Sequence, residues 1–353
     1  MSIASHFHTH QQKLPRLPIP SLQETTTKLL EWSHALLTPE ERIQSTQAVE
    51  EFLTDKEQGE ALQQLLLDYD KQTSYGTYFE EFWNEAYLAP NASVVLNLNP
   101  FFVLEDDPTT KGNDQIVRAS SLVFSSLKFV SDLRRGQLEP DIIGRKKTVP
   151  LCMSQFARLF STSRIPTNEC DRIESDETAT HVVVIRQGQF YYFDALWPTG
   201  EVAISQIDLA RNFQAIIQDA AECDPVSSAM RAVGVLTAAS RDQWAKTRTS
   251  MMAFSNKNKE VFKIIDTALF VVCLDDCSPE SIDDRAANML HGSYHLGTRL
   301  CVWWQLCGGP QSCQIQCLLN GSLTLFFIAP VVFDHSQLFS CSYDNHCINC
   351  SPL

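Results

Sequence analysis

The sequence predicts a mixed α and β fold with a large core. Stretches with helical spacing of apolar residues precede and separate short apolar runs that are rich in β-branched residues. The chain has 353 residues, 44% of them hydrophobic, which is enough for one large domain or two smaller ones. A change of composition near residue 299 separates this predicted domain region from a tail that we expect to be poorly structured.

Helix starts are marked by capping residues. The proline-rich lead LPRLPIPS ends at Ser21, and Glu24 follows three residues later, which is the capping-box pattern. Thr38–Glu41 repeats it as a cap, a proline at the first helical position and two acids in the first turn. Further helices are expected over residues 57–69, 78–88 and 115–135, the last of them ending at Gly136.

Strand patterns lie between and after these helices. HVVVIRQGQFYYFDAL (181–196) contains two β-rich runs around Arg186–Gln189 and predicts a hairpin. The alternating run SVVLNL (93–98) predicts a further strand. The short apolar runs AVGVLT (232–237) and ALFVVCLD (268–275) are typical of buried strands.

The last part of the chain differs in kind from the rest. After Arg299 there is no Lys or Arg, and seven of the twelve cysteines lie between Cys301 and Cys350. Two cysteine pairs, 313/317 and 347/350, have zinc-like internal spacing, but an apolar run separates them, so we expect unpaired thiols and no metal site. That composition is typical of a frameshift, a retained intron or a mispredicted exon.

Charge and hydropathy exclude two classes of partner. The net charge is −14 and no basic stripe offsets it, so we expect no nucleic-acid binding. The most apolar run, residues 318–333, is shorter than the ~20 residues of a membrane span and contains Asn, Gly and Pro, so no span is expected. Residues 1–12 are expected to be a disordered start.

Six stretches together resemble one family in order and approximate spacing. The chain resembles the choline/carnitine acyltransferases, most of all the carnitine acetyltransferases, over residues 13–296. The stretches are KLPRLPIPSLQET (13–25), FWNEAYL (82–88), PLCMSQFARLFSTSRIP (150–166), GVLTAASRDQWAK (234–246), VCLDD (272–276) and MLHGS (289–293).

This resemblance implies a fold and a reaction. Family members have two related domains that resemble chloramphenicol acetyltransferase, with a tunnel between them. They move an acyl group between coenzyme A and carnitine, both of which are substrates, and no cofactor is implied. Residues 13–296 then correspond to an incomplete first domain, and residues 297–353 to an unrelated tail, so we expect a truncated member.

The family's general base is expected in a motif of His, three residues, Asp or Glu, then Gly. Histidine suits this role because its pKa lies near neutrality. None of the nine histidines has this pattern. His335 is a partial candidate, but Phe339 stands where the acid belongs and Ser340 where the glycine belongs. We therefore assign no catalytic residue and expect the chain to be inactive; the alternative function is a non-catalytic acyl- or partner-binding module.

Two aromatic residues are the candidates for substrate binding. Trp83 and Tyr87 lie in FWNEAYL, one of the stretches that carry the resemblance, and in the family the Trp and Tyr of this stretch line the carnitine and acyl side of the tunnel. One helical turn separates them, so both can face one cavity, although aromatic residues at this spacing also form cores. His291 in MLHGS is interpreted as a structural histidine.

The resemblance leaves the compartment open. Family members occur in mitochondria and peroxisomes, which are the expected compartments, with the cytoplasm as the alternative. Without the second domain, the face that it covers in the family is expected to be apolar and exposed, which favours self-association.

Overall fold

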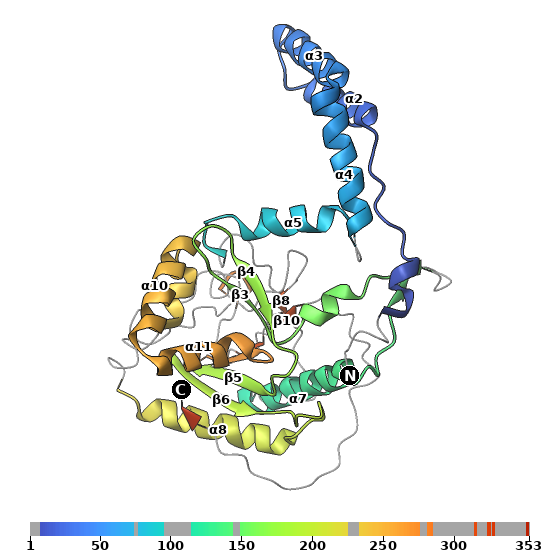
Figure 1. Ribbon diagram of the computed structural model, residues 1–353. Helices are drawn as coiled ribbons and strands as arrows, with labels where there is room; N and C mark the ends of the chain where they lie inside the picture. Colours follow the sequence, from blue (N-terminus) through green and yellow to red (C-terminus); the bar gives the residue numbers. More distant parts are fainter. Residues whose placement is uncertain are drawn as a thin grey trace. The chain divides into compact units, whose positions relative to one another are not determined.

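The computed structural model describes residues 8–73, 77–94, 114–143, 149–224, 233–275 and 281–284, with four short strands after residue 300. The chain forms two compact units, residues 11–85 and residues 1–10 with 86–353 (Figure 1). His291, His335 and the tail cysteines lie outside the described residues, as does most of the run 93–98.

The smaller unit is helical, and its helices begin where the capping residues predict. In α2 (Leu22–Ser33), the Ser21 hydroxyl accepts the Glu24 amide and the Glu24 carboxylate accepts the Ser21 amide. Thr38 and Glu41 form the same reciprocal pair at the start of α3 (Pro39–Thr54). The remaining elements are the π-helical turn η2 (Lys56–Glu60), α4 (Ala61–Gln72) and α5 (Phe79–Leu88), the last of which spans the boundary between the units.

The larger unit is built on a five-stranded mixed sheet in the order β11-β6-β5-β7-β9. β5 (His181–Arg186) and β6 (Gln189–Asp194) form the predicted hairpin. Its turn residues Gln187 and Gly188 have φ angles of 47° and 75°, as a two-residue turn of type I′ requires. β7 (Val271–Leu274) pairs parallel to β5, which places both strands at the centre of the sheet.

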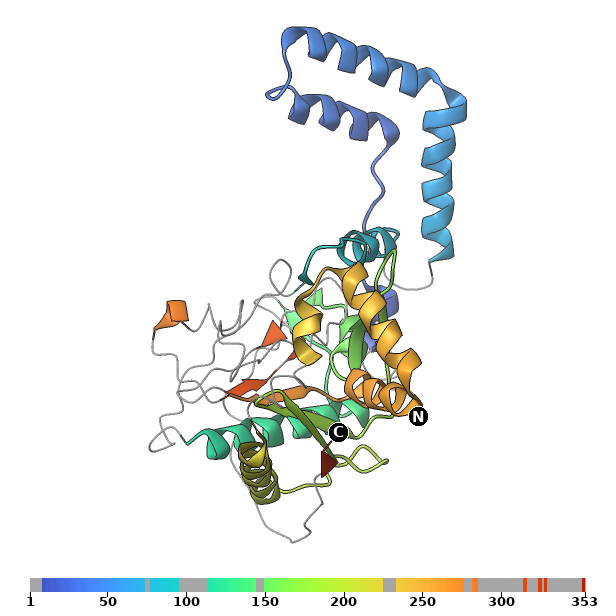
Figure 2. The same ribbon diagram turned by 90° about the vertical axis from the view of Figure 1, so that its left-hand side faces the viewer.

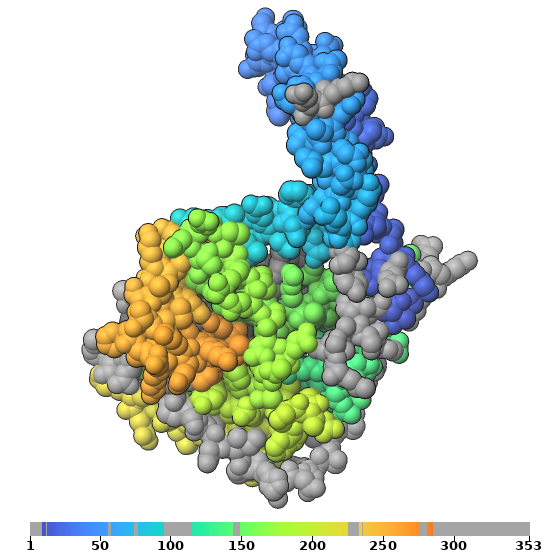
Figure 3. Space-filling view, in the orientation of Figure 1, coloured from blue at the N-terminus to red at the C-terminus, as the bar shows by residue number. Residues whose placement is uncertain are grey.

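Helices cover both faces of this sheet, as Figures 1 and 2 show. Val182 and Val184 of β5 pack with α7 (Gln115–Arg134) and α8 (Gln206–Glu222), whereas Val183 and Ile185 pack with α10 (Arg241–Phe254) and α11 (Asn256–Thr267). Because successive strand side chains point to opposite faces, one continuous apolar strand supplies two cores. In the space-filling view α10 and α11 form one continuous surface (Figure 3).

Shorter elements complete the described part. The predicted long helix ends as expected, since α7 stops at Arg134 and Gly136 has a φ of 65°. The others are η1 (His8–Lys13), β1 (Ile142–Ile143), β2 (Val149–Pro150), η3 (Ser154–Arg158), β3 (Thr162–Ile165), β4 (Arg172–Ser175), η4 (Val233–Ala238), β8 (Gln314–Ile315), β9 (Leu323–Leu325), β10 (Phe327–Ile328) and β11 (Ser351–Pro352).

The prediction of a buried strand over 232–237 is wrong. This segment forms the 3₁₀ helix η4, in which the Thr237 hydroxyl donates to the Gly234 carbonyl at 2.7 Å. A run of this length fits a strand or a buried turn of helix equally well, and Gly234 weakens the strand. Among the described residues, no helix combines the length and the apolar composition needed to cross a bilayer.

Candidate active site

The predicted substrate-binding residues lie on α5. Glu80 and Glu81 stand in its first turn, where carboxylates favour the positive end of a helix dipole. Trp83 and Tyr87 follow one helical turn apart, and both side chains are half-buried. The Trp83 ring packs against Phe79 with a centroid distance of 5.6 Å. The helix and the spacing are as predicted, and the substrate-binding role stays a prediction.

The carboxyl end of α5 contacts a buried group of charged residues in the larger unit. Asp171, directly before β4 (Arg172–Ser175), has a side chain only 1% exposed. Its Oδ2 atom accepts the Nε–H of Arg164 at 2.5 Å and the Nε–H of Arg241 at 2.6 Å. Because buried charges are tolerated only when they are paired and hydrogen-bonded, these three side chains depend on one another.

A second buried ion pair lies beside the first. Both terminal nitrogens of Arg248 donate to the carboxylate of Asp266, and its guanidinium stacks over Phe262 at 4.6 Å. The Ser163 hydroxyl donates to the Asp266 backbone carbonyl. Burial raises the pKa of Asp266 above its ordinary value, and the ion pair with Arg248 opposes that shift.

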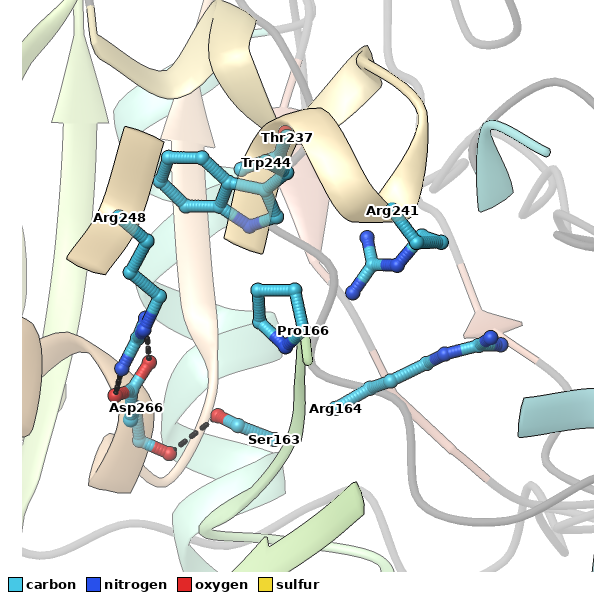
Figure 4. A pocket seen from close by; sticks show the side chains of 8 residues that line it. All are labelled: Ser163, Arg164, Pro166, Thr237, Arg241, Trp244, Arg248 and Asp266. Carbon is cyan, nitrogen blue, oxygen red and sulfur yellow. Dashed lines mark hydrogen bonds and ion pairs between the residues drawn. The ribbon is translucent and has the colours of Figure 1, made fainter. Parts of the chain in front are cut away.

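These charged side chains surround a very small cavity (Figure 4). Its volume is about 10 Å³, which is room for about one water molecule and far too little for a carnitine or an acyl chain. The cluster is therefore a framework rather than a substrate pocket. The lining residues are Ser163, Arg164, Pro166, Thr237, Arg241, Trp244, Arg248 and Asp266.

A larger groove lies within the helical unit. It has a volume of about 280 Å³ and lies between α2 and α3. The residues that line it are Leu30, Glu31, Ser33, His34, Leu37, Arg42, Ser45 and Thr46. These side chains include one histidine, His34, and one carboxylate, Glu31, and we assign no catalytic role to either.

Two other titratable groups in the larger unit's core, His181 and Cys273, are interpreted as structural. The ring Nε2 of His181 lies 2.7 Å from the Ile264 carbonyl, and Tyr192 packs edge-on against the ring. Burial raises the pKa of the Cys273 thiol well above its ordinary value, which disfavours the reactive thiolate. In the part of the chain that the structure describes, no three His, Cys, Asp or Glu residues gather as metal ligands would.

The charged cluster was not predicted from the sequence. Arg164 and Arg241 both lie in stretches that carry the family resemblance, but no role was assigned to them. The available signal was an arginine inside a run of strand-forming residues, FSTSRIP, because such a residue must find a buried partner. Asp171 had no such signal.

Comparisons with known proteins agree with the resemblance. A family model described as "Choline/Carnitine o-acyltransferase" matches residues 17–305. Human "Carnitine O-palmitoyltransferase 2, mitochondrial" is 32% identical over 319 residues, covering 82% of this chain and 47% of its own length. A "Putative mitochondrial carnitine O-acetyltransferase" of Saccharomyces cerevisiae is 36% identical, covering 79% and 43%. Mouse "Choline O-acetyltransferase" is 30% identical, covering 79% and 44%.

The mixed sheet with helices on both faces is consistent with an α/β acyltransferase domain, which is the class of protein that these matches indicate. The chain belongs to the choline/carnitine O-acyltransferase family. It spans about half the length of the curated relatives it matches.

Proposed function

We propose that the substrate site of this protein is one for acyl transfer, acetyl in particular, between coenzyme A and carnitine, and that the 353-residue chain binds substrate there without transferring the group. The observation that carries the proposal is the family match over residues 17–305. Relatives at similar identity are named for palmitoyl and for acetyl transfer, and the relative with 36% identity supports acetyl. The fold proposed for the whole protein is two domains resembling chloramphenicol acetyltransferase, with acyl-CoA and carnitine as substrates and no cofactor.

The reaction needs a base that this sequence does not offer in the expected pattern. The carnitine hydroxyl oxygen attacks the thioester carbonyl, the carbon–sulfur bond breaks, and the hydroxyl proton passes to the departing thiolate. Without a His-x3-Asp/Glu-Gly motif, we propose that the 353-residue chain binds substrate through Trp83 and Tyr87 but does not turn it over. Their half-buried positions on one helix support a lining role.

Binding and turnover are tested separately. Calorimetric titration with L-carnitine is expected to show binding that weakens about tenfold in Trp83→Ala and in Tyr87→Ala, since each loses a buried aromatic contact of about 1.4 kcal/mol. Phe254→Ala, which changes an exposed aromatic side chain, is the matched control. Thiol release from acetyl-CoA with carnitine is expected to be absent; sustained release would contradict the proposed inactivity, and no binding would contradict the site.

The second candidate is a non-catalytic module that binds an acyl group or a protein partner. The observation that favours it is the exposed apolar surface of the helical unit, which includes Trp32 at 76% and Leu36 at 85% exposure. Titration with acyl-CoA in the absence of carnitine distinguishes the two functions. Binding that is unaffected by Tyr87→Ala would favour this module over the carnitine site.

The proposed compartment is the mitochondrion. The names of the human and yeast relatives both include it. Peroxisome and cytoplasm are the alternatives. Fractionation of cells that express the full chain with a C-terminal tag is expected to recover it with mitochondrial markers, and recovery with peroxisomal or cytosolic markers would contradict the proposal.

A further inference from the structure

We propose that Asp171 is a positioning residue: through its two arginine partners it fixes the carboxyl end of α5, and with it Tyr87, in the substrate site. This inference rests on the proposed function, because Tyr87 has a substrate to meet only if the chain binds one. Asp171 itself touches no substrate in this proposal, since it is buried behind the end of the helix.

The first contacts are at the Leu88 carbonyl. Leu88 is the last residue of α5 and follows Tyr87 directly. Its carbonyl accepts the backbone amide of Asp171 at 3.0 Å and the Nη2 of Arg164 at 3.4 Å. The last carbonyls of a helix have no partner within it, so these donors satisfy one of them. The Asp171 carboxylate holds Arg164 in place by accepting its Nε–H.

A second set of contacts holds the residues that follow. The Asn91 carbonyl accepts the backbone amide of Arg241 at 3.0 Å, and its side-chain oxygen accepts the amide of Asp242 at 2.8 Å. Asn91 therefore caps the first turn of α10 from outside the helix. Arg241 is also the second guanidinium on Asp171, so both sets of contacts meet at one carboxylate.

The frame behind the carboxylate is firmly attached. Arg248 lies two turns after Arg241 on α10 and is paired with Asp266 at the end of α11. Ser163, next to Arg164 on β3, bonds to the Asp266 backbone. Helix α10 and strand β3 are thus joined at two adjacent places.

Helix α5 is held in part from the helical unit, where the Tyr69 hydroxyl donates to the Glu81 carboxylate and the Tyr69 ring contacts Phe82. None of its residues is fully buried, in contrast to α7 and α8 of the same chain. A helix of 10 residues is marginal in water by itself and is normally stabilised by packing an apolar face. The polar contacts at Leu88 and Asn91 therefore contribute directly to the position of its carboxyl end. Losing them would let Tyr87 move while the sheet and its covering helices stay folded.

Hydrogen exchange with mass spectrometry of the full chain tests the positioning step. Asp171→Asn is expected to speed exchange of the peptide 82–91 at least tenfold, with α8 unchanged. Arg164→Lys keeps the charge but removes the guanidinium donors, so a smaller increase is expected at the same peptide. Glu174→Gln, which removes an exposed carboxylate paired with Arg172, is the matched control and is expected to change nothing.

Two exchange results would overturn the proposal. One is unchanged exchange of 82–91 in both Asp171→Asn and Arg164→Lys. The other is acceleration of α8 to the same extent in Arg164→Lys, which would show a general loss of stability. Because Arg164→Lys leaves the buried charge balanced, this comparison holds even where Asp171→Asn fails to fold.

Titration with L-carnitine separates this proposal from the proposed function. Arg164→Lys is expected to weaken carnitine binding at least threefold and Asp171→Asn at least tenfold, without loss of the folded state. Unchanged affinity together with faster exchange of 82–91 would overturn the positioning role. If the unaltered chain does not bind carnitine, the proposed function has failed, and the exchange comparison still decides whether Asp171 holds α5.

Discussion

Single side chains in the larger unit carry either apolar packing or buried charge. Phe213 of α8 is completely buried and packs against Phe193 of β6 with a centroid distance of 6.3 Å. Phe254, at the end of α10, is 87% exposed. Phe213 is therefore expected to contribute much more to the free energy of folding than Phe254, because only Phe213 has its ring removed from water.

Phe213→Ala is expected to lower the free energy of unfolding by about 3–5 kcal/mol, since it combines lost transfer free energy with a cavity. Phe254→Ala is the matched control and is expected to change it by less than about 0.5 kcal/mol. Urea unfolding followed by fluorescence measures both. Equal effects at the two positions would contradict the packing described for α8.

At the scale of elements, the helical unit depends on its caps. α3 and α4 contain no fully buried residue, so packing contributes little to either helix. The reciprocal bonds of Ser21 with Glu24 and of Thr38 with Glu41 are therefore a large share of what defines the starts of α2 and α3. Hydrogen bonds from the Ser21 and Thr38 backbone amides lower the pKa of Glu24 and Glu41 below the ordinary 4.5.

This shift predicts a pH dependence. A lowered carboxyl pKa contributes stability that is present above the ordinary value of 4.5 and is lost as the pH falls through the lower folded pKa. Helix content measured by circular dichroism is expected to fall below pH 4.5. In the double variant Glu24→Gln and Glu41→Gln, which keeps the capping bond without titrating, that fall is expected to be smaller. An identical acid profile would contradict the role of these caps.

The junction of α3 and α4 gives a steric prediction. A Cβ atom on Gly59 would lie 2.4 Å from the Phe52 carbonyl oxygen, a distance that backbone atoms do not tolerate. Gly59→Ala is therefore expected to destabilise this junction and lower the helix content. At Gly200 an added Cβ would make only ordinary van der Waals contacts, with Arg134 at 3.7 Å and Arg135 at 3.8 Å, but φ is +86°, so Gly200→Ala tests backbone strain without a clash. A thermal melt in which Gly59→Ala matches the unaltered chain would contradict the described junction.

The local elements were predictable where the signal is local. Ser21, Thr38 and Gly136 mark helix ends by their own chemistry, and the residues Gln187 and Gly188 define the hairpin turn. The structure of segment 232–237 was not predictable, because a short apolar run contains too few residues to show whether its hydrophobic period is that of a strand or of a helix. In the candidate site, spacing placed Trp83 and Tyr87 on one helix. The role of Asp171 could not be predicted from the sequence, since its partner Arg241 lies 70 residues away along the chain.

At the scale of the whole molecule, the helical unit exposes apolar side chains that its own helices do not cover. They lie on α2, α3 and α4, or between α2 and α3, and are Leu29, Trp32, Leu36, Ile43, Leu62 and Leu65. Large apolar side chains exposed to water favour association between chains. The sequence predicts self-association through the face that a second domain would cover, and the exposed side chains of the helical unit offer a second surface for it; both stay predictions.

Analytical ultracentrifugation is expected to show a sedimentation coefficient that rises with protein concentration. The double variant Trp32→Glu and Leu36→Glu is expected to remove most of that rise, because it places charge on two of the most exposed apolar positions. Phe254→Glu is the control on the larger unit. A concentration-independent monomer in the unaltered chain would contradict the prediction.

The parallel pairing of β5 with β7 has a consequence for biosynthesis. Arg186 at the end of β5 donates to the carbonyl of Leu274, which is 88 residues later. Translation adds roughly 5–20 residues per second, so β5 emerges from the ribosome several seconds before its neighbour exists. During that interval the β5–β6 hairpin has an unpaired, apolar edge. A chaperone that binds such edges would act on this chain before β7 is synthesised.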